Sequence, residues 1–518
     1  MSIASELTAL NGYILGAYDE INTKGGTVPA NKNMANLASA IATISGGGGG
    51  GGGSDLSAQP RLTSYNRNTG VLTGTNLGTS GVVYVFDRMQ NKGVAVATSS
   101  WSNTSITLST PVDLANLTGT TSIWAVPSGG TESTKLLLRG DIAVTGYGRI
   151  YYKQADDSIS YVQMTTTTHW NYLANNSTIS KSFVIDGHTI FTEDIVGVEV
   201  GETPSITSAG FCRNFHNLNQ PLYLNNISII GQSLLSECPD FNQPVVLGVS
   251  SATISSDFLK SCTSFNQPLD LSMVSTVGGS FMESCTSFNQ PVDLSSATTL
   301  GASFMKYCVS FNSPIDVSSV TAIQGASGLG YGFLSYCFSF NQPLSLPEVT
   351  SISNGFMDYC SMFNQPLSLP KVTSIGTYFM TYCYRFNQPL SLPEATDIAE
   401  YFMAYCYMFN QPLSLPNVTS IKSNFMAYTR SLASKVTLGA ASVTAAYMFY
   451  DSYLLPELDV GSSTIVGTSL NQTLAVQSNT CKAYINGVTL TGANASTWKS
   501  TLADRTSTPY RKLIDGTA

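Results

Sequence analysis

Charged side chains are scarce in this sequence. Asp, Glu, Lys and Arg together make up only 11% of the 518 residues, whereas ordinary soluble domains contain about a quarter. The formal net charge is −8, and Lys and Arg form no cluster along the chain. Nucleic acid and anionic membranes are bound through such clusters, so we expect neither as the main partner.

Histidine and long apolar runs are also missing. Three His residues are too few for most His-dependent catalytic or zinc sites. No uninterrupted apolar run approaches the roughly 18 residues of a membrane span, and Glu6 stands where a secretion signal would carry positive charge. The composition therefore predicts a structural or binding protein without membrane insertion, cofactor, metal site or catalytic residues. A chain of this length should form several domains.

The first 45 residues carry two stripes of apolar residues at helical spacing, in residues 5–21 and 34–44. Two such helices bury little surface alone, so they either pair with each other or dock on a larger assembly. The phrases GGTVP and NLASAIATI are similar to the opening segment of many phage tail and fibre proteins. This resemblance implies that residues 1–45 attach to other virion proteins. A run of glycines then predicts a flexible linker over residues 46–54.

Residues 55–134 alternate apolar and polar side chains in short runs, as at Val82, Tyr84 and Phe86, with Gly and Asn between the runs. This pattern predicts a β-sandwich. The phrases PRLTSYNRNTGVLTGTNLGTSGVVYVFD and SWSNTSITLSTP resemble the TIG-type immunoglobulin-like domain, which implies that Trp101 lies in the core. Because such a fold hosts many functions, we expect a spacer, with direct ligand contact as the alternative.

Residues 135–204 are expected to form a β-rich connector that caps the next domain. The segment GRIYYKQADDSISYVQM contains two alternating runs about a polar turn at Asp156 and Asp157. One grouping of His and Asp follows, but its spacing matches no known metal site, and we expect it at surface turns. Its members are His169, Asp186, His188 and Asp194.

A repeat of about 23 residues dominates residues 205–455. A fixed period of this size indicates the stacked coils of a solenoid. Each copy contains an F-N-x-P phrase, and the repeat phenylalanines are Phe241, Phe265, Phe288, Phe311, Phe340, Phe363, Phe386 and Phe409. One longer interval contains a Gly-rich insertion at residues 325–332, which predicts a protruding loop. Residues 456–518 are expected to add a final coil and a C-terminal cap.

Each position in a coil can be given a structural role. The alternation of Leu367, Ser368 and Leu369 predicts a short strand with both Leu side chains inward. The next apolar residues fall three and four apart, which predicts a helical turn; they are Phe379, Met380, Cys383 and Phe386. The Asn of each FNQP phrase should join a ladder of side-chain amides that satisfies backbone groups at a turn.

Eight of the ten Cys residues each lie three positions before a repeat Phe. They are expected to be buried, reduced thiols, with disulfides between adjacent coils as the alternative. The phrases LPEVTSI, LPKVTSI and LPNVTSI, together with FMDYC, FMTYC and FMAYC, resemble the BspA-type leucine-rich repeat family. That resemblance implies an adhesin or another surface-recognition protein without catalytic residues.

The outward strand positions of the coils form a candidate binding row. It consists of Asp270, Asp293, Asp316, Ser345, Ser368, Ser391 and Ser414. At variable positions elsewhere in the coils, Tyr384, Arg385 and Tyr407 are further candidates for contact with glycan or protein, with packing on the next coil as the alternative. A stacked row of carboxylates could also serve a retaining glycosidase or hold Ca²⁺. The sequence does not distinguish an acid from a nucleophile among them.

The expected function is that of a phage virion protein of the tail-fibre or head-fibre type. It would be assembled in the host cytoplasm, act outside the cell, and bind a glycan or protein of the bacterial surface through many weak contacts. Two alternatives remain open at this stage: a β-solenoid enzyme that cleaves surface polysaccharide, and a purely structural decoration or fibre protein. Homo-oligomerisation is also left open.

Overall fold

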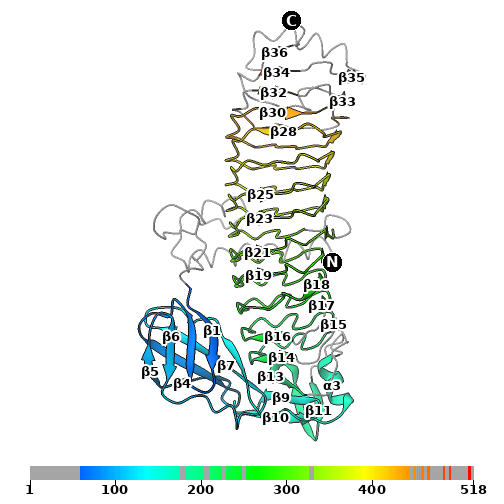
Figure 1. Cartoon of the computed structure of the whole chain (residues 1–518). Coiled ribbons are helices and arrows are strands. Elements are labelled where there is room, and N and C mark those ends of the chain that lie inside the picture. Colours follow the sequence, from blue (N-terminus) through cyan, green and yellow to red (C-terminus); the bar gives the residue numbers. More distant parts are fainter. Residues whose placement is uncertain are drawn as a thin grey trace. The chain divides into compact units, whose positions relative to one another are not determined.

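The computed structural model is mainly β and divides into two compact units. The amino-terminal unit contains residues 54–308 and 313–320, and the carboxy-terminal unit contains residues 309–312 and 321–518 (Figure 1). The described residues are 59–174, 182–201, 210–224, 229–247, 252–325, 332–439, 442–443, 447–450, 452, 454, 457–459, 464–466, 482–484, 489–491 and 512–514. The predicted helical anchor (1–45), the linker (46–54) and most of the Gly-rich insertion lie outside them.

Two antiparallel four-stranded sheets open the amino-terminal unit and form a sandwich, as predicted. One sheet contains β1 (Arg61–Asn66), β2 (Val71–Thr75), β6 (Ser105–Leu108) and β5 (Thr98–Trp101), and the other contains β4 (Lys92–Val96), β3 (Gly81–Asp87), β7 (Thr120–Pro127) and β8 (Leu136–Arg139). Their shared core includes Leu72 and Ile106 from one sheet and Val83 and Ile123 from the other. Trp101 is only half-buried and packs at the edge of this core, because its indole N–H donates to the carbonyl of Leu77 at 2.7 Å.

The connector follows as a three-stranded sheet with a short helix and a hairpin. Its elements are β9 (Gly148–Lys153), β10 (Ile159–Met164), α3 (Thr167–Ala174), β11 (Ser182–Ile185), β12 (His188–Phe191), the 3₁₀ turn η1 (Thr192–Asp194) and β13 (Ile195–Val200). The predicted pair of strands about Asp156 and Asp157 is confirmed: β9 and β10 pair in antiparallel register, and Asp157 takes a left-handed φ of 63° in the turn.

The coils of the amino-terminal unit stack through short parallel strands. They are β14 (Leu222–Leu224), β15 (Ile229–Ile230), β16 (Val245–Leu247), β17 (Ala252–Ile254), β18 (Val274–Val277), β19 (Val292–Asp293), β20 (Thr299–Leu300) and β21 (Ile315–Asp316). Pairing joins equivalent residues of successive copies, for example Val277 with Leu300 and Val292 with Ile315. A coil therefore repeats its backbone geometry with each copy of the sequence.

The carboxy-terminal unit contains the same arrangement with two rows of strands per coil (Figure 1). The strands are β22 (Ala322–Ile323), β23 (Leu344–Ser345), β24 (Ser351–Ile352), β25 (Leu367–Ser368), β26 (Ser374–Ile375), β27 (Asp397–Ile398), β28 (Leu413–Leu415), β29 (Ser420–Ile421), β30 (Val436–Leu438), β31 (Ser442–Val443), β32 (Glu457–Asp459), β33 (Thr464–Val466), β34 (Lys482–Tyr484), β35 (Thr489–Thr491) and β36 (Lys512–Ile514). Parallel pairing continues through β36. The stacked strands thus extend beyond the expected end of the repeats at residue 455.

The side of each coil that carries the F-M-x-Y-C phrase is not helical. Every second residue there has a positive φ, as at Tyr378 (62°), Met380 (51°) and Tyr382 (60°). The backbone N–H of Tyr382 donates forward to the carbonyl of Ala404 in the next coil, and that of Met380 donates back to Phe356 in the preceding coil, both at 2.9 Å. The backbone therefore alternates in handedness and bonds to both neighbours.

The predicted helical turn is wrong for a physical reason. A helical turn would keep its hydrogen bonds within one coil, whereas the alternating backbone uses them to join coils. Left-handed geometry costs a residue other than glycine about 1–2 kcal/mol. Repetition offsets this cost, because each such residue meets an identical partner one coil away. At the first of the three positive-φ positions, the coil that contains Gly355 uses glycine, whose φ is 71°.

Phenylalanine columns fill the interior of the coils. The ring of Phe363 lies 5.9 Å from that of Phe340 and 5.6 Å from that of Phe386, with nearly parallel planes. A second column joins Phe379 to Phe402 at 5.2 Å. All these rings are fully buried. Because each coil supplies two large aromatic side chains, the narrow interior is filled without a long helix.

The predicted asparagine ladder is confirmed. The side-chain oxygen of Asn364 accepts a hydrogen bond from the backbone N–H of Asn387 at 2.9 Å, and Asn364 donates in the same way to Asn341 at 2.8 Å. The ladder continues to Asn410, whose side chain accepts from the backbone N–H of Ala433. Each amide thus satisfies a backbone donor at a turn that the strand ladders do not reach.

The nine cysteines of the described residues are all free and buried, as expected. Each repeat thiol for which a hydrogen bond is resolved donates to a backbone carbonyl in the preceding coil, as Cys406 does to Met380 at 3.2 Å. In the following coils Thr429 and Ser452 take the same position, and the hydroxyl of Ser452 donates to the carbonyl of Met426 at 3.3 Å. A small hydrogen-bond donor takes this position in most coils, whereas the first copy has the buried Phe215 there. Burial raises the pKa of the thiols.

Candidate binding surface

The predicted outward row is exposed throughout. Its members are Asp270, Asp293, Asp316, Ser345, Ser368, Ser391 and Ser414, and all seven side chains face solvent. The three Asp residues belong to the amino-terminal unit and the four Ser residues to the carboxy-terminal unit. Within each unit the row follows the strands, because equivalent residues such as Asp293 and Asp316 are parallel partners.

The carboxylates of this row are engaged in their own turns. Asp293 accepts hydrogen bonds from the backbone N–H and hydroxyl of Ser295, at 3.1 and 2.7 Å, and these bonds lower the pKa of the Asp293 carboxyl. Asp270 and Ser272 repeat the arrangement. A glycosidase needs one carboxyl held protonated and another ionised. The repeated turn instead gives the Asp residues equivalent environments, so their geometry indicates a structural role.

The structure also separates the grouping of His and Asp in the connector. His188 lies with its Nδ1 3.5 Å from the hydroxyl of Tyr152, and His169 lies in α3, where its backbone N–H bonds to Thr166. Among the described residues, no three His, Cys, Asp or Glu side chains come together as they would around a metal ion. Asp186 takes a left-handed φ of 48° at a hairpin turn, in agreement with the predicted surface turn.

Tyrosines form columns on the carboxy-terminal unit, which we call the tyrosine face. The main column consists of Tyr336, Tyr359, Tyr382, Tyr405 and Tyr428, whose successive ring centroids are 4.6, 4.2, 4.4 and 4.3 Å apart. Two flanking pairs are Tyr384 with Tyr407, at 5.1 Å, and Tyr378 with Tyr401, at 4.9 Å. The rings of each column are nearly parallel, whereas Tyr384 and Tyr407 meet the main column edge to face.

The alternating backbone produces this face. Tyr378 and Tyr382 both occupy positive-φ positions and are half-buried, whereas Met380 between them is fully buried. Tyr336 is buried and the other rings are half-buried. Burial together with the neighbouring phenols raises the pKa of Tyr384 and Tyr405. These two side chains are therefore neutral hydroxyl groups at physiological pH.

Of the predicted contact residues, the structure brings Tyr384 and Tyr407 together. Arg385, which follows Tyr384 in the sequence, is half-buried. The guanidinium of Arg430 lies 5.0 Å above the ring of Tyr407. Packing between coils, the stated alternative for these tyrosines, does occur. The sequence interpretation missed the main column because it assigned the F-M-x-Y-C phrase to a helix. The sequence did contain a signal for the main column, namely a tyrosine that recurs once per repeat from Tyr336 onward.

A buried carboxyl lies beneath the tyrosine face. Asp358 is 4% exposed, and its Oδ1 has no hydrogen-bond partner among the described residues. The same coil position holds Ser335, Thr381, Ala404 and Ala427 in four neighbouring coils, all fully buried, and the half-buried Tyr450 in the coil after them. Burial raises the pKa of Asp358 well above its ordinary value. The position thus favours a small or neutral side chain, and Asp358 is the exception.

The sandwich is fixed to the connector around Glu199, in the amino-terminal unit. The Glu199 carboxylate is buried and accepts hydrogen bonds from the backbone N–H of Thr120 at 3.2 Å and the hydroxyl of Tyr151 at 2.7 Å. Arg88 completes the group with its Nε 3.1 Å from the carboxylate. A side chain at Gly119, whose φ is 73°, would collide with this carboxylate. Burial and the adjacent Glu199 raise the pKa of Tyr151 to about 12.

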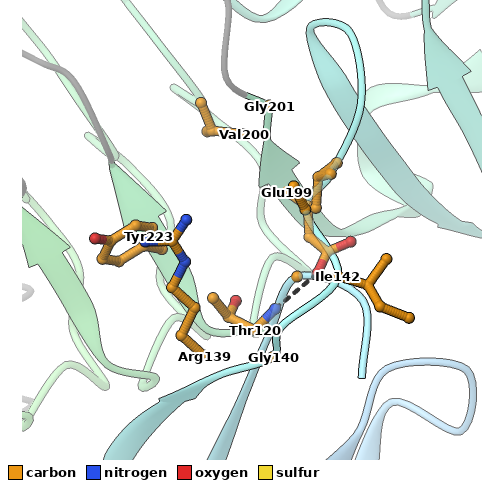
Figure 2. A pocket seen from close by; sticks show the side chains of 11 residues that line it. Thr120, Arg139, Gly140, Ile142, Glu199, Val200, Gly201 and Tyr223 are labelled. Atoms are coloured by element: carbon orange, nitrogen blue, oxygen red, sulfur yellow. Dashed lines mark hydrogen bonds between the residues drawn. The ribbon is translucent and has the colours of Figure 1, made fainter. Parts of the chain in front are cut away.

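A small hollow lies beside this group (Figure 2). The figure shows Glu199 directed toward Thr120, with Arg139 and Tyr223 across the hollow. The guanidinium of Arg139 lies 5.4 Å above the ring of Tyr223. Because Glu199 already has several hydrogen-bond partners, it offers little to a ligand, and the group acts as a structural joint.

Three glutamines also hold the sandwich, a role that the sequence did not reveal. Two are from FNQP phrases and one is from the LNQP phrase of the first copy. Their side-chain oxygens accept hydrogen bonds from a guanidinium, a hydroxyl and a backbone N–H of the sandwich, at 2.9, 3.0 and 3.0 Å. The pairs are Gln220 with Arg88, Gln243 with Ser122, and Gln267 with Lys135. The repeat edge can therefore bind another β domain.

Comparison with known proteins points to the repeats. The family model described as a Mycoplasma protein of unknown function, DUF285, matches residues 211–318 and 269–369. A leucine-rich repeat protein from Bacteroides ovatus is similar in structure at 12% identity, with a TM-score of 0.43 over 68% of this chain and 91% of that one. A leucine rich cell surface protein from Faecalibacterium prausnitzii has 13% identity and a TM-score of 0.29, over 70% of this chain and 97% of that one.

No curated protein matches the chain significantly. No helix in the described part of the chain is both long and apolar enough to cross a membrane. The DUF285 match lies wholly within the repeat region. It ends at residue 369, so it includes Tyr359 of the tyrosine face but not Tyr382.

Proposed function

We propose that this protein is a phage virion protein whose repeat coils bind the surface of a bacterial host. The resemblance of residues 1–45 to phage tail and fibre proteins supports attachment to the particle, and the glycine run supports a mobile tether. In this proposal the sandwich is an immunoglobulin-like spacer. The protein is assembled in the host cytoplasm and acts outside it, as tail fibre or head fibre.

The tyrosine face is the observation that carries the binding function. A purely structural coil needs a filled interior, which the phenylalanine columns already provide. The half-buried tyrosines add an aromatic surface with hydrogen-bonding groups to coils that otherwise share the same interior residues. Tyr and Arg are the residues most enriched at the energetic centres of interfaces, and Arg385 and Arg430 accompany the tyrosines here.

The binding is expected to be weak per coil and strong per particle. Several coils carry the same tyrosines, and a virion carries several copies of its fibres, so that individually weak contacts are multiplied. A glycan or a protein of the cell surface satisfies this description. The exposed Asp row contributes to the turns of its coils rather than to a reactive pair of acids, so binding rather than cleavage is proposed.

Purified full-length protein, labelled with a fluorophore, should bind cells of the host bacterium, and binding should saturate. Two multiple-alanine variants distinguish the candidate surfaces. Alanine at Tyr384, Arg385 and Tyr407 should weaken cell binding by about tenfold or more. Alanine at Asp293 and Ser368 of the outward row is the matched control and should leave it unchanged. Failure of the wild-type protein to bind any cells that the phage adsorbs to would contradict the proposal.

Attachment to the particle is tested separately. Deletion of residues 1–53 should abolish incorporation into virions while purified protein still binds cells. Incorporation of the truncated protein would overturn the anchor function of residues 1–45. Release of reducing sugars from host polysaccharide by the wild-type protein would favour the enzyme alternative.

A further inference from the structure

We propose that the tyrosine face recognises an uncharged polysaccharide strand, which lies along the main column and hydrogen-bonds to the hydroxyl edges of its rings. This inference rests on the proposed function and specifies its ligand. The hydrogen-bonding residues are Tyr359, Tyr382 and Tyr405, with Tyr384 and Tyr407 as the adjoining wall.

The geometry of the column determines which part of each ring is available. Tyr382 is stacked on Tyr359 at 4.2 Å and on Tyr405 at 4.4 Å, with planes 19° and 18° from parallel. Both of its faces are therefore covered by neighbours. A sugar ring cannot stack on Tyr382, although stacking is the usual contribution of exposed aromatics to carbohydrate binding. What remains accessible is the ring edge.

The hydroxyl groups of the column are already associated with one another. The phenols of Tyr359, Tyr382, Tyr405 and Tyr428 interact in series. A phenol both donates and accepts one or more hydrogen bonds, so a hydroxyl within the series keeps acceptor capacity for a ligand. The column offers one such group per coil, at the spacing of the stacked rings.

The charge of the surface favours an uncharged ligand. Raised pKa values keep the phenols of Tyr382 and Tyr405 neutral, and the Oδ1 of the buried Asp358 has no hydrogen-bond partner within the described part of the chain. Arg430 lies over Tyr407 rather than over the main column. A polyanion would need a row of cations along its length, and the main column consists of neutral rings. A regularly repeating, hydroxyl-rich polymer matches both the periodicity and the neutrality.

Rigidity of the column favours binding as well. Stacking on both sides fixes the Tyr382 and Tyr405 rings before a ligand arrives. Ordering a free side chain on binding costs free energy, and folding has already ordered these rings. The preformed row explains how small contributions from single hydroxyls can add up.

The test removes hydroxyls and keeps the rings. The double variant Tyr382→Phe/Tyr405→Phe should retain stacking and fold, and a circular dichroism spectrum and thermal midpoint close to wild type would verify this. Binding is measured by calorimetry to the neutral and the charged polysaccharide fractions from walls of the bacterium that the wild-type protein binds. The matched control is Tyr161→Phe, which removes a hydroxyl from a 45% exposed ring outside the face.

We expect the wild-type protein to bind the neutral fraction, with an affinity that depends little on salt. The double variant should lose affinity by about tenfold or more, and Tyr161→Phe should bind as tightly as wild type. Wild-type affinity of the double variant, or preference for the charged fraction with a steep loss at high salt, would overturn the inference while leaving surface recognition intact. Absence of binding to intact host cells would instead overturn the proposed function itself.

Discussion

The thiol of Cys383 donates a hydrogen bond to the backbone carbonyl of Met357, one coil earlier, with 3.2 Å between Sγ and O. Cys360 and Cys406 make the same bond to the coils before them. The cysteines that recur once per repeat in the sequence therefore act as hydrogen-bond donors between coils. Neither disulfide formation nor metal binding is needed to explain it.

Replacement of this donor gives the first prediction. Cys383→Val fills the same space without a donor and removes one of the two hydrogen bonds to the Met357 carbonyl, which keeps the bond from the backbone N–H of Cys360. The free energy of unfolding should fall by about 0.5–1.5 kcal/mol. Cys383→Ser keeps a donor, as Ser452 does in its coil, and should cost less. Thermal unfolding of the two variants provides the comparison. Equal destabilisation would show that packing, not hydrogen bonding, determines the residue at this position.

Thiol accessibility gives the second prediction. Burial raises the pKa of Cys262 and Cys383, so thiolate is rare and reagent cannot enter. In a Cys481→Ser variant, which removes the one cysteine outside the described residues, Ellman's reagent should react with none of the other nine thiols until denaturant is added. Rapid reaction of several thiols in the native protein would contradict the buried ladder.

The third prediction concerns pH and Asp358. Its folded-state pKa is raised by burial, so the folded protein holds a proton that the unfolded chain has released above about pH 4. The free energy of unfolding is therefore highest below the pKa that Asp358 has in the unfolded chain. It falls by about 1.4 kcal/mol per pH unit as the pH rises from there toward the pKa of Asp358 in the folded protein. Asp358→Asn should remove this fall and be more stable than wild type at pH 7. If the stabilities of wild type and Asp358→Asn changed in parallel from pH 4 to 8, Asp358 would not be the source of the pH dependence.

The fourth prediction tests the asparagine ladder. Asn364→Ala removes the acceptor of the Asn387 N–H and should cost about 1–3 kcal/mol. Asn364→Asp retains an acceptor oxygen and should cost less at neutral pH. Alanine at the adjacent Gln365, which is half-buried, is the control. Denaturant unfolding measures all three, and an alanine at Gln365 that is as damaging as Asn364→Ala would argue against a ladder.

The fifth prediction tests the joint between sandwich and connector. Glu199→Ala leaves the guanidinium of Arg88 buried without its carboxylate and should cost about 3–5 kcal/mol. The exposed pair of Arg67 and Asp141 supplies the control, since solvent screens this pair and Asp141→Ala should change the stability little. Limited proteolysis should cut the Glu199→Ala variant near the sandwich first. Similar protease resistance of the two variants would show that the buried group does not hold the joint.

The period of the repeat could be predicted because identical residues must meet at equal intervals. The inward positions of Leu367 and Leu369, the Asn364 ladder and the buried Cys383 all followed from that requirement, and the structure places them as expected. The outward position of Ser368 followed as well. Each of these predictions depends only on the repeat and on alternation within a strand.

The handedness of the backbone could not be predicted in the same way. Phe379 and Cys383 are spaced as in a helix, and the period alone does not reveal that Met380 lies at a positive φ. The hydrogen bonds that favour this geometry come from the neighbouring coils, so no local segment contains the information. The main tyrosine column was missed as a direct consequence.

The contacts of the glutamines were also hidden. Gln267 and Gln388 stand in the same FNQP phrase, yet Gln267 accepts a hydrogen bond from Lys135 of the sandwich. Their difference depends on a domain more than 100 residues away in the sequence. Repetition of a motif predicts the shared environment of its copies but not what one end of the array meets.

The ladders that join the coils also set the unit by which such a chain can change in length. A duplication of 23 residues within the carboxy-terminal repeats would give every amide, thiol and ring of the new segment a partner above and below. An insertion of another size would shift all of these columns at once unless it looped out of the stack. Recombination between copies should therefore generate longer and shorter relatives in whole coils, and each added coil would extend the tyrosine columns by one rung.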